Sequence, residues 1–115
     1  MTISYDEFSK VELRIATVLS AERVEGSEKL LKIQIDLGSD PSTGSGLGQR
    51  QIISGIAKSY DPAVLVGKQI VVTTNLEPRI IMGLESNALL LASGNADGPV
   101  ILIPDRPVPP GSGVK

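Results

Sequence analysis

The chain has 115 residues, of which 41% are hydrophobic, and its 11 Lys and Arg against 13 Asp and Glu give a formal net charge of -2. This length predicts one domain over residues 1–115, with a core that needs no cross-links. Cys and His are both absent, which excludes disulfides, thiolate metal sites and cysteine nucleophiles and removes the commonest general base. The composition therefore favours a binding module over an enzyme, and its acidic balance means that any nucleic-acid site must gather its cations on one face.

The first elements in chain order are a short helix and a long strand. Ser4 and Glu7 have the spacing of a capping box, so we expect a helix from there to about Lys10, with Phe8 turned onto the core. Polar and apolar residues then alternate as far as Ser20, which predicts a strand that bends to serve two sides of a barrel. Its inward face is expected to carry Val11, Leu13, Ile15, Thr17 and Leu19.

Turn signals separate the remaining strands. Alternation is strictest from Leu31 to Leu37, and the stretch rich in Gly, Ser and Pro that follows predicts a flexible loop over residues 39–48. Further strands are expected at about Gln49–Ile56, Gln69–Leu76 and Ala88–Ser93, with one helical turn at Pro62 between the third and fourth strands. A short apolar strand near residues 99–104 and an extended tail over residues 105–115 complete the chain.

These elements predict the all-β class. The best match is an OB-fold, a five-stranded Greek-key barrel with a short amino-terminal helix and a helical turn between strands 3 and 4. The spacing of the strands leaves an SH3-like barrel or a sandwich as the alternative.

Four segments in order, Phe8–Val18, Ser27–Gly38, Arg50–Tyr60 and Asn75–Ala92, resemble one known family. This is the tRNA-binding domain found at the carboxyl end of many methionyl-tRNA synthetases, in freestanding tRNA-binding proteins, in CsaA-type export chaperones and in the endothelial monocyte-activating polypeptide. The resemblance implies an OB-fold that binds tRNA by shape and backbone. It also implies a homodimer whose interface lies among the amino-terminal helix, the fifth-strand region and the carboxyl-terminal tail.

The resemblance also suggests site residues. Asn75 and Ser86 match the Asn and the Ser of the family's RNA-facing site, whereas Leu89 and Ala88 stand where the family has Met and Gly. Read from position alone, Asn75 is a residue of a turn at a strand end, and Ser86 ends the turn before the fifth strand.

Among the remaining polar residues, Lys58 and Arg79 are the candidate phosphate contacts, and Asn87 offers an amide to a base edge or a 2′-OH. Arg14 and Lys32 occupy the polar phases of their strands, so both can point outward to RNA. The alternative for each Lys and Arg is an ordinary solvated charge. With only three aromatic residues in the chain, folded RNA is a better ligand than single strands read by stacking, and Tyr60 is expected to pack beside the helical turn.

Three functions follow from this interpretation. The first is a tRNA-binding protein, freestanding or an accessory subunit of methionyl-tRNA synthetase. The second is a CsaA-like homodimeric chaperone that binds unfolded polypeptide through an apolar groove at Leu89 and Ile81. The third is an enzyme, which the scattered carboxylates disfavour. We expect no cofactor, no metal, no membrane association and a cytoplasmic location.

Overall fold

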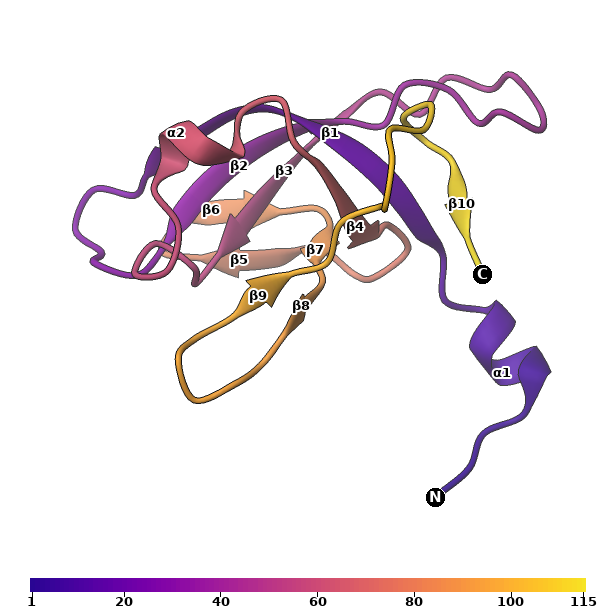
Figure 1. Cartoon of the computed structure of the whole chain (residues 1–115), viewed down its shortest axis with the longest axis horizontal. Coiled ribbons are helices and arrows are strands. Elements are labelled where there is room, and N and C mark those ends of the chain that lie inside the picture. Colours follow the sequence, from indigo (N-terminus) through magenta and orange to yellow (C-terminus); the bar gives the residue numbers. More distant parts are fainter.

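Five antiparallel strands form the centre of the molecule in the computed structural model, which describes residues 1–115 (Figure 1). Their order in the sheet is β3-β2-β1-β4-β7, and β3 and β7 come together to close it into a barrel. The strands are β1 (Leu13–Arg23), β2 (Leu31–Asp36), β3 (Gln49–Ser54), β4 (Gln69–Thr73) and β7 (Leu89–Leu90). The predicted OB-like barrel is therefore confirmed.

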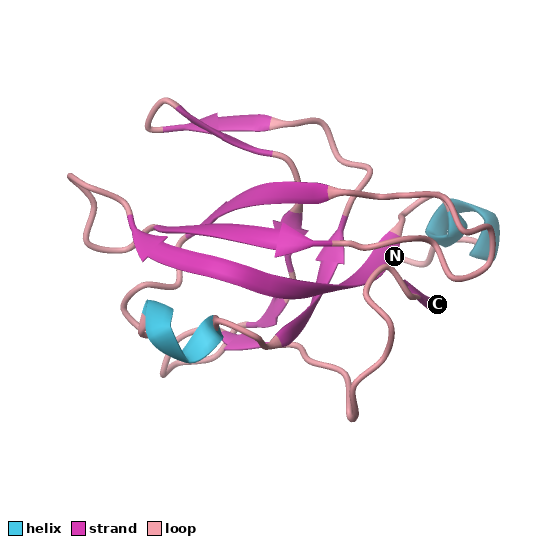
Figure 2. Cartoon of the chain, turned by 90° about the horizontal axis from the view of Figure 1, so that it is seen from above, coloured by secondary structure: helices cyan, strands magenta, loops and turns pink.

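Two short helices, two short strand pairs and one further short strand surround the barrel. Helix α1 (Tyr5–Ser9) projects from one end, and α2 (Pro62–Leu65) lies at the other end, between β3 and β4 (Figure 2). The hairpin of β5 (Arg79–Ile81) and β6 (Leu84–Ser86) lies against β3, while β8 (Ala92–Ser93) pairs with β9 (Val100–Ile101). Near the carboxyl end, β10 (Gly113–Val114) pairs with the start of β1.

The core follows the alternation of β2, as expected. Leu31, Ile33 and Ile35 are fully buried and pack in one cluster, whereas the residues between them are only partly buried. A second, smaller cluster lies outside the barrel wall, where the β5–β6 hairpin covers Ile53. The barrel therefore buries apolar side chains on both faces of β3.

The predicted inward face of β1 was wrong. Ala16 and Val18 point into the core, whereas Val11 and Leu19 are exposed. The opposite phase is also partly apolar because the carboxyl-terminal tail covers it, where Gly111 donates to the Ile15 carbonyl and the Ile15 amide donates to Ser112. Because both faces of β1 carry apolar residues, the sequence does not show which face points into the core. The pairing of β1 with β2 also shifts register between Val18 and Ser20.

Two further expectations differ from the structure. The capping box at Ser4 and Glu7 is present, but α1 buries none of its residues and Phe8 stays 38% exposed. No strand was assigned between the fourth and fifth strands, where the structure has the β5–β6 hairpin, which turns at Met82 and Gly83 with φ of 51° and 78°. Positive φ at both central positions is the geometry of a two-residue hairpin turn.

The barrel closes through side chains more than through a main-chain ladder. Between β3 and the segment before β7, one main-chain hydrogen bond joins the Asn87 amide to the Gln51 carbonyl. The other bonds use side chains: Gln51 Nε2 donates to the Glu85 carbonyl at 2.8 Å, Arg50 Nη1 donates to the Asn87 carbonyl at 3.0 Å, and the Ile53 amide donates to Ser86 Oγ at 3.0 Å. Arg50 Nη1 also donates to the Thr74 carbonyl, just after β4, at 2.8 Å. This seam sets the position of the β5–β6 hairpin.

Candidate nucleic-acid interface

Four residues from four neighbouring segments lie side by side across the outer wall of the barrel. Lys32 is directly opposite Ile53 in the β2–β3 ladder, and the Ile53 amide donates to Ser86 Oγ at 3.0 Å. Ser86 is in turn directly opposite Arg79 in the β5–β6 hairpin. Two strand-pair steps of about 4.8 Å each and the hydrogen bond between Ile53 and Ser86 therefore link Lys32 to Arg79. The structure therefore brings these two predicted cations onto adjoining surface.

Lys58 lies beyond the end of β3 beside two further cations, Arg23 and Lys29, to which the sequence pattern did not point. Ala57, the residue before Lys58, contacts both of them. Its carbonyl accepts from Arg23 Nη1 at 3.3 Å, and its amide donates to the Lys29 carbonyl at 3.0 Å. Arg23, Lys29 and Lys58 are all exposed, and none is in an ion pair. We call these three residues the basic cluster. Only the fold brings them together, because Arg23 and Lys58 are far apart in the sequence.

Acidic residues moderate the charge of this surface. Lys32 Nζ is 2.7 Å from Glu22 Oε1, so its charge is partly neutralised, and its side chain is 32% exposed. Arg79 and Lys58 have no carboxylate partner. Of the predicted cations here, those two carry the charge that is free to meet a phosphate.

Asn75 and Ser86 are occupied within the chain. Asn75 Oδ1 accepts from the Glu12 amide at 2.8 Å, and Asn75 Nδ2 donates to the Lys10 carbonyl at 2.6 Å. Ser86 is only 8% exposed, and besides its bond from Ile53 its hydroxyl donates to the Ala88 carbonyl at 3.2 Å. Both side chains hold backbone segments in place, which the sequence pattern could not reveal.

Asn87 and Leu89 lie just beyond Ser86, where the chain enters β7. The Asn87 amide and carbonyl both serve the seam, and its half-buried side chain makes no hydrogen bond within the chain. Leu89 is 41% exposed and pairs with the buried Thr73 of β4. These two side chains are accessible at the edge of the surface.

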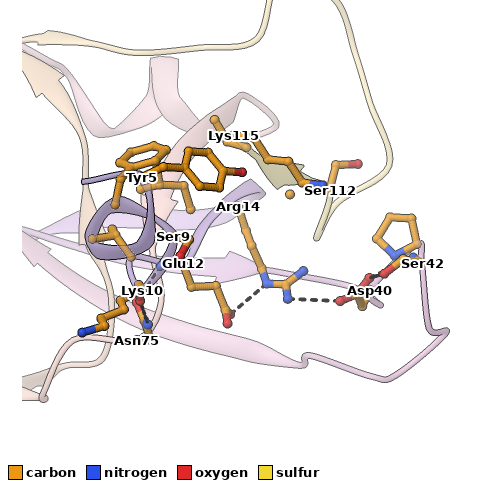
Figure 3. A pocket seen from close by; sticks show the side chains of 16 residues that line it. Tyr5, Ser9, Lys10, Glu12, Arg14, Asp40, Ser42, Asn75, Ser112 and Lys115 are labelled. Atoms are coloured by element: carbon orange, nitrogen blue, oxygen red, sulfur yellow. Dashed lines mark hydrogen bonds and ion pairs between the residues drawn. The ribbon is translucent and has the colours of Figure 1, made fainter. Parts of the chain in front are cut away.

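Arg14 is held in a network on the other side of the barrel. Its guanidinium donates to Glu12 Oε1 at 2.9 Å and to Asp40 Oδ2 at 3.1 Å (Figure 3). It also donates to the Gly111 carbonyl at 2.8 Å, and its side chain is only 14% exposed. With three donors engaged inside the chain, Arg14 does not present its charge to a ligand as expected. It instead ties the loop at Asp40 and the tail to the start of β1.

The network shifts the pKa values of its members in the directions that ion pairing requires. Hydrogen bonds from the hydroxyl and the amide of Ser42, and then Arg14, lower the pKa of Asp40 to about 2. A hydrogen bond from Thr74, and then Arg14, lowers the pKa of Glu12, while Glu12 raises the pKa of Arg14. Both carboxylates therefore stay charged through the neutral range.

A cleft of about 530 Å³ opens beside this network, between α1 and β10. Tyr5 and Phe8 of α1 line it together with Val11 and Val114, and Tyr5 is 74% exposed (Figure 3). Apolar side chains of one helix thus face a cleft that no other part of the chain fills.

No aromatic side chain is placed for stacking on the surface that holds Lys58 and Arg79. The Tyr60 hydroxyl accepts from the Ile101 amide at 3.0 Å, and its ring packs against the core beside α2, as predicted. Tyr5 and Phe8 lie at the cleft. No group of three or more metal-binding side chains is present, and neither helix has the length and hydrophobicity that crossing a membrane requires.

Comparison with known families gives one match, to the model described as "Putative tRNA binding domain", over residues 13–113. The chain belongs to this family. The tRNA-binding domain is a binding module, although curated relatives carry it as part of an enzyme.

Relatives of this tRNA-binding domain include proteins of two kinds. The methionine--tRNA ligase of Methanothrix thermoacetophila is 46% identical over 98% of the chain, and the chain spans only 16% of that protein. A solved MetRS-related protein from Pyrococcus horikoshii is 29% identical, covers 100% of this chain and 99% of its own, and has a TM-score of 0.88. The chaperone CsaA from Bacillus anthracis is 30% identical, covers 100% of both chains and has a TM-score of 0.86.

Proposed function

We propose that this chain binds folded tRNA through the outer surface of β2, β3 and the β5–β6 hairpin, with Arg79 and the basic cluster as its phosphate contacts. The observations behind the proposal are that Arg23, Lys29 and Lys58 gather around Ala57 without ion-pair partners, and that Arg79, also without one, lies on the hairpin that packs against β3. Strands 2 and 3 with their flanking loops are also where OB-folds bind nucleic acids. Lys32, Asn87 and Leu89 complete the proposed surface.

Recognition on this surface runs through the RNA backbone and shape. A surface without a stacking aromatic ring gains little from unpaired bases. Cations and amides can instead meet phosphates and 2′-hydroxyls of a folded RNA. Four phosphate contacts per chain predict that affinity falls roughly 50- to 150-fold between about 50 and 200 mM salt.

The test is a tRNA gel shift at these two salt concentrations, with two double variants of equal charge change. Lys58→Ala with Arg79→Ala removes two cations from the proposed surface, and the control, Lys68→Ala with Arg106→Ala, removes two that line a cleft beside the tail. We expect the first pair to lose at least tenfold in affinity and to flatten the salt dependence, and the control to stay within about twofold. Absence of any complex of the unmodified chain at 50 mM salt, or an equal loss in both pairs, would refute the proposal.

The chain is proposed to act as a homodimer joined at the cleft between α1 and β10. The exposed rings of Tyr5 and Phe8 would there be covered by a second copy. Sedimentation equilibrium should give twice the mass of the chain, and Tyr5→Ser with Phe8→Ser should give the mass of one. Val64→Ser, at an exposed apolar residue of α2 at the opposite end of the barrel, is the control that should leave the dimer intact.

The biological setting follows from the relatives. The chain would serve as a freestanding tRNA-binding protein or as an accessory subunit of methionyl-tRNA synthetase, without catalytic activity of its own and in the cytoplasm. Co-purification of the synthetase with the tagged chain would separate the two settings.

A second candidate function is the binding of unfolded polypeptide, as the CsaA similarity suggests. The observation in its favour is the apolar exposure of the β5–β6 hairpin, where Ile80 is 69% and Met82 57% exposed. Ile81, the predicted groove residue, packs instead against the outer cluster. If a chemically unfolded protein aggregates at the same rate with and without this chain, the candidate fails.

A further inference from the structure

The side chain of Asn75 bonds to two backbone groups on either side of a single residue. Its oxygen accepts from the Glu12 amide at 2.8 Å and its nitrogen donates to the Lys10 carbonyl at 2.6 Å, so it spans Val11 (Figure 3). A side-chain amide offers two donor hydrogens and two acceptor lone pairs. Half of that capacity is used on the segment that joins α1 to β1.

These bonds continue the ladder between β1 and β4. Leu13 is paired with Thr73, and the Thr74 amide donates to the Glu12 carbonyl at 3.0 Å. After Thr74 the main chain leaves the sheet. The planar amide of Asn75 then supplies the donor and the acceptor that the next residue of a strand would have supplied.

Helix α1 has little else to fix its direction. It is five residues long and buries none of them, and a helix of that length is not stable alone. Its capping box is internal to the helix, so this box holds the helical turn without attaching it to the barrel. Lys10 is the residue that caps its carboxyl end, and its carbonyl is one of the terminal groups that need a partner from outside the helix. Asn75 supplies that partner.

We infer that Asn75 is a positioning residue, which sets the direction of α1 on the barrel and influences tRNA binding only through assembly of the dimer. The inference rests on the proposed function, in which α1 forms the contact between two copies. The same residue reads from the sequence as an RNA contact. The two assignments differ in how the tRNA affinity of an Asn75 variant depends on protein concentration. A positioning role predicts a loss that high concentration restores, and a direct contact predicts a loss that does not change.

The test uses Asn75→Ala in the full chain, with Asn95→Ala as control. Asn95 is exposed in the loop between β8 and β9, where its side chain accepts only from the Asp97 amide. We expect Asn75→Ala to speed hydrogen exchange of the Glu12 amide at least tenfold and to weaken the dimer at least tenfold. Its tRNA affinity should fall at low protein concentration and return to within about twofold at concentrations that restore the dimer. Asn95→Ala should change none of these quantities.

A second variant, Asn75→Asp, separates the assignments by how its loss depends on protein concentration. It keeps an acceptor for the Glu12 amide but sets a carboxylate oxygen against the Lys10 carbonyl, so positioning predicts a loss of tRNA affinity that high protein concentration restores. A direct contact predicts a loss that persists at every protein concentration, because the added negative charge would face phosphate.

Three results would overturn the inference. These are unchanged exchange of the Glu12 amide in Asn75→Ala, a loss of tRNA affinity that is equal at all protein concentrations, and an unmodified chain that remains monomeric throughout. If the unmodified chain is a dimer that does not bind tRNA, the proposed function fails, and the amide exchange and the dimer mass still decide the role of Asn75.

Discussion

Replacing Ser86 with Ala should destabilise the chain and leave its contact with RNA intact. The hydroxyl accepts from the Ile53 amide at 3.0 Å and donates to the Ala88 carbonyl at 3.2 Å, at a residue that is 8% exposed. In the variant the Ile53 amide stays buried beneath the β5–β6 hairpin without a partner. The substitution removes a single oxygen atom, so loss of packing adds little.

The expected loss is set by that unpaired donor. Leaving a buried donor unsatisfied costs about 1–3 kcal/mol, so we expect the free energy of unfolding to fall by about 2 kcal/mol. With an unfolding entropy of about 2.1 cal/mol/K per residue, this corresponds to a fall in Tm of about 8 °C for a chain of this length.

The assay is urea and thermal unfolding followed by far-UV circular dichroism, with tRNA affinity measured at a temperature where both proteins are fully folded. Ser93→Ala is the matched control, because Ser93 is an exposed strand serine whose hydroxyl makes no hydrogen bond. A change in stability below about 0.5 kcal/mol together with a clear loss of tRNA affinity would refute the reasoning and return Ser86 to the RNA-facing set.

Three further outcomes are expected. Gly111→Ala should lower the free energy of unfolding by at least about 2 kcal/mol in urea titrations, because Gly111 has φ of 89° and a Cβ there would meet two backbone carbonyls. Met82→Asn should raise stability by about 0.5–1 kcal/mol, since Asn before Gly is favoured in a turn with φ of 51° and 78°; an unchanged Tm would contradict this. For Asp40, whose pKa falls from 3.8 to about 2 on folding, the charged form stabilises the fold above pH 4 and this contribution is lost as the pH falls toward 2. Urea titrations from pH 5 to pH 2 should therefore show a shallower loss of stability in Asp40→Asn than in the unmodified chain.

The barrel was predictable from the sequence because alternating polar and apolar residues indicate its strands. Leu31, Ile33 and Ile35 are separated by polar residues, and one face of β2 is buried as that pattern requires. The phase of β1 was not predictable, since the tail that covers its outer face lies about a hundred residues further along the chain. Met82 and Gly83 gave only a weak turn signal, so the β5–β6 hairpin also escaped notice.

The candidate site was predictable only in part. A sequence shows that Lys58 and Arg79 are charged, and the structure leaves both unpaired. It does not show which polar side chains are already engaged, and Asn75 and Arg14 find their partners in segments distant in sequence. Arg23 was missed because its proximity to Lys58 depends on the barrel.

The closure of the barrel at Gln51 and Asn87 has a consequence for where the folded molecule opens locally. A sheet joined mostly by side chains has few cooperative bonds to break at that line, so the wall should part there before it parts elsewhere. The two sides of such an opening carry different parts of the surface proposed for RNA. One side is β3, and the other is the β5–β6 hairpin with Arg79. A polyanion bound across both sides would hold them together. Hydrogen exchange of the Ile53 and Asn87 amides should then be slower in its presence than in its absence.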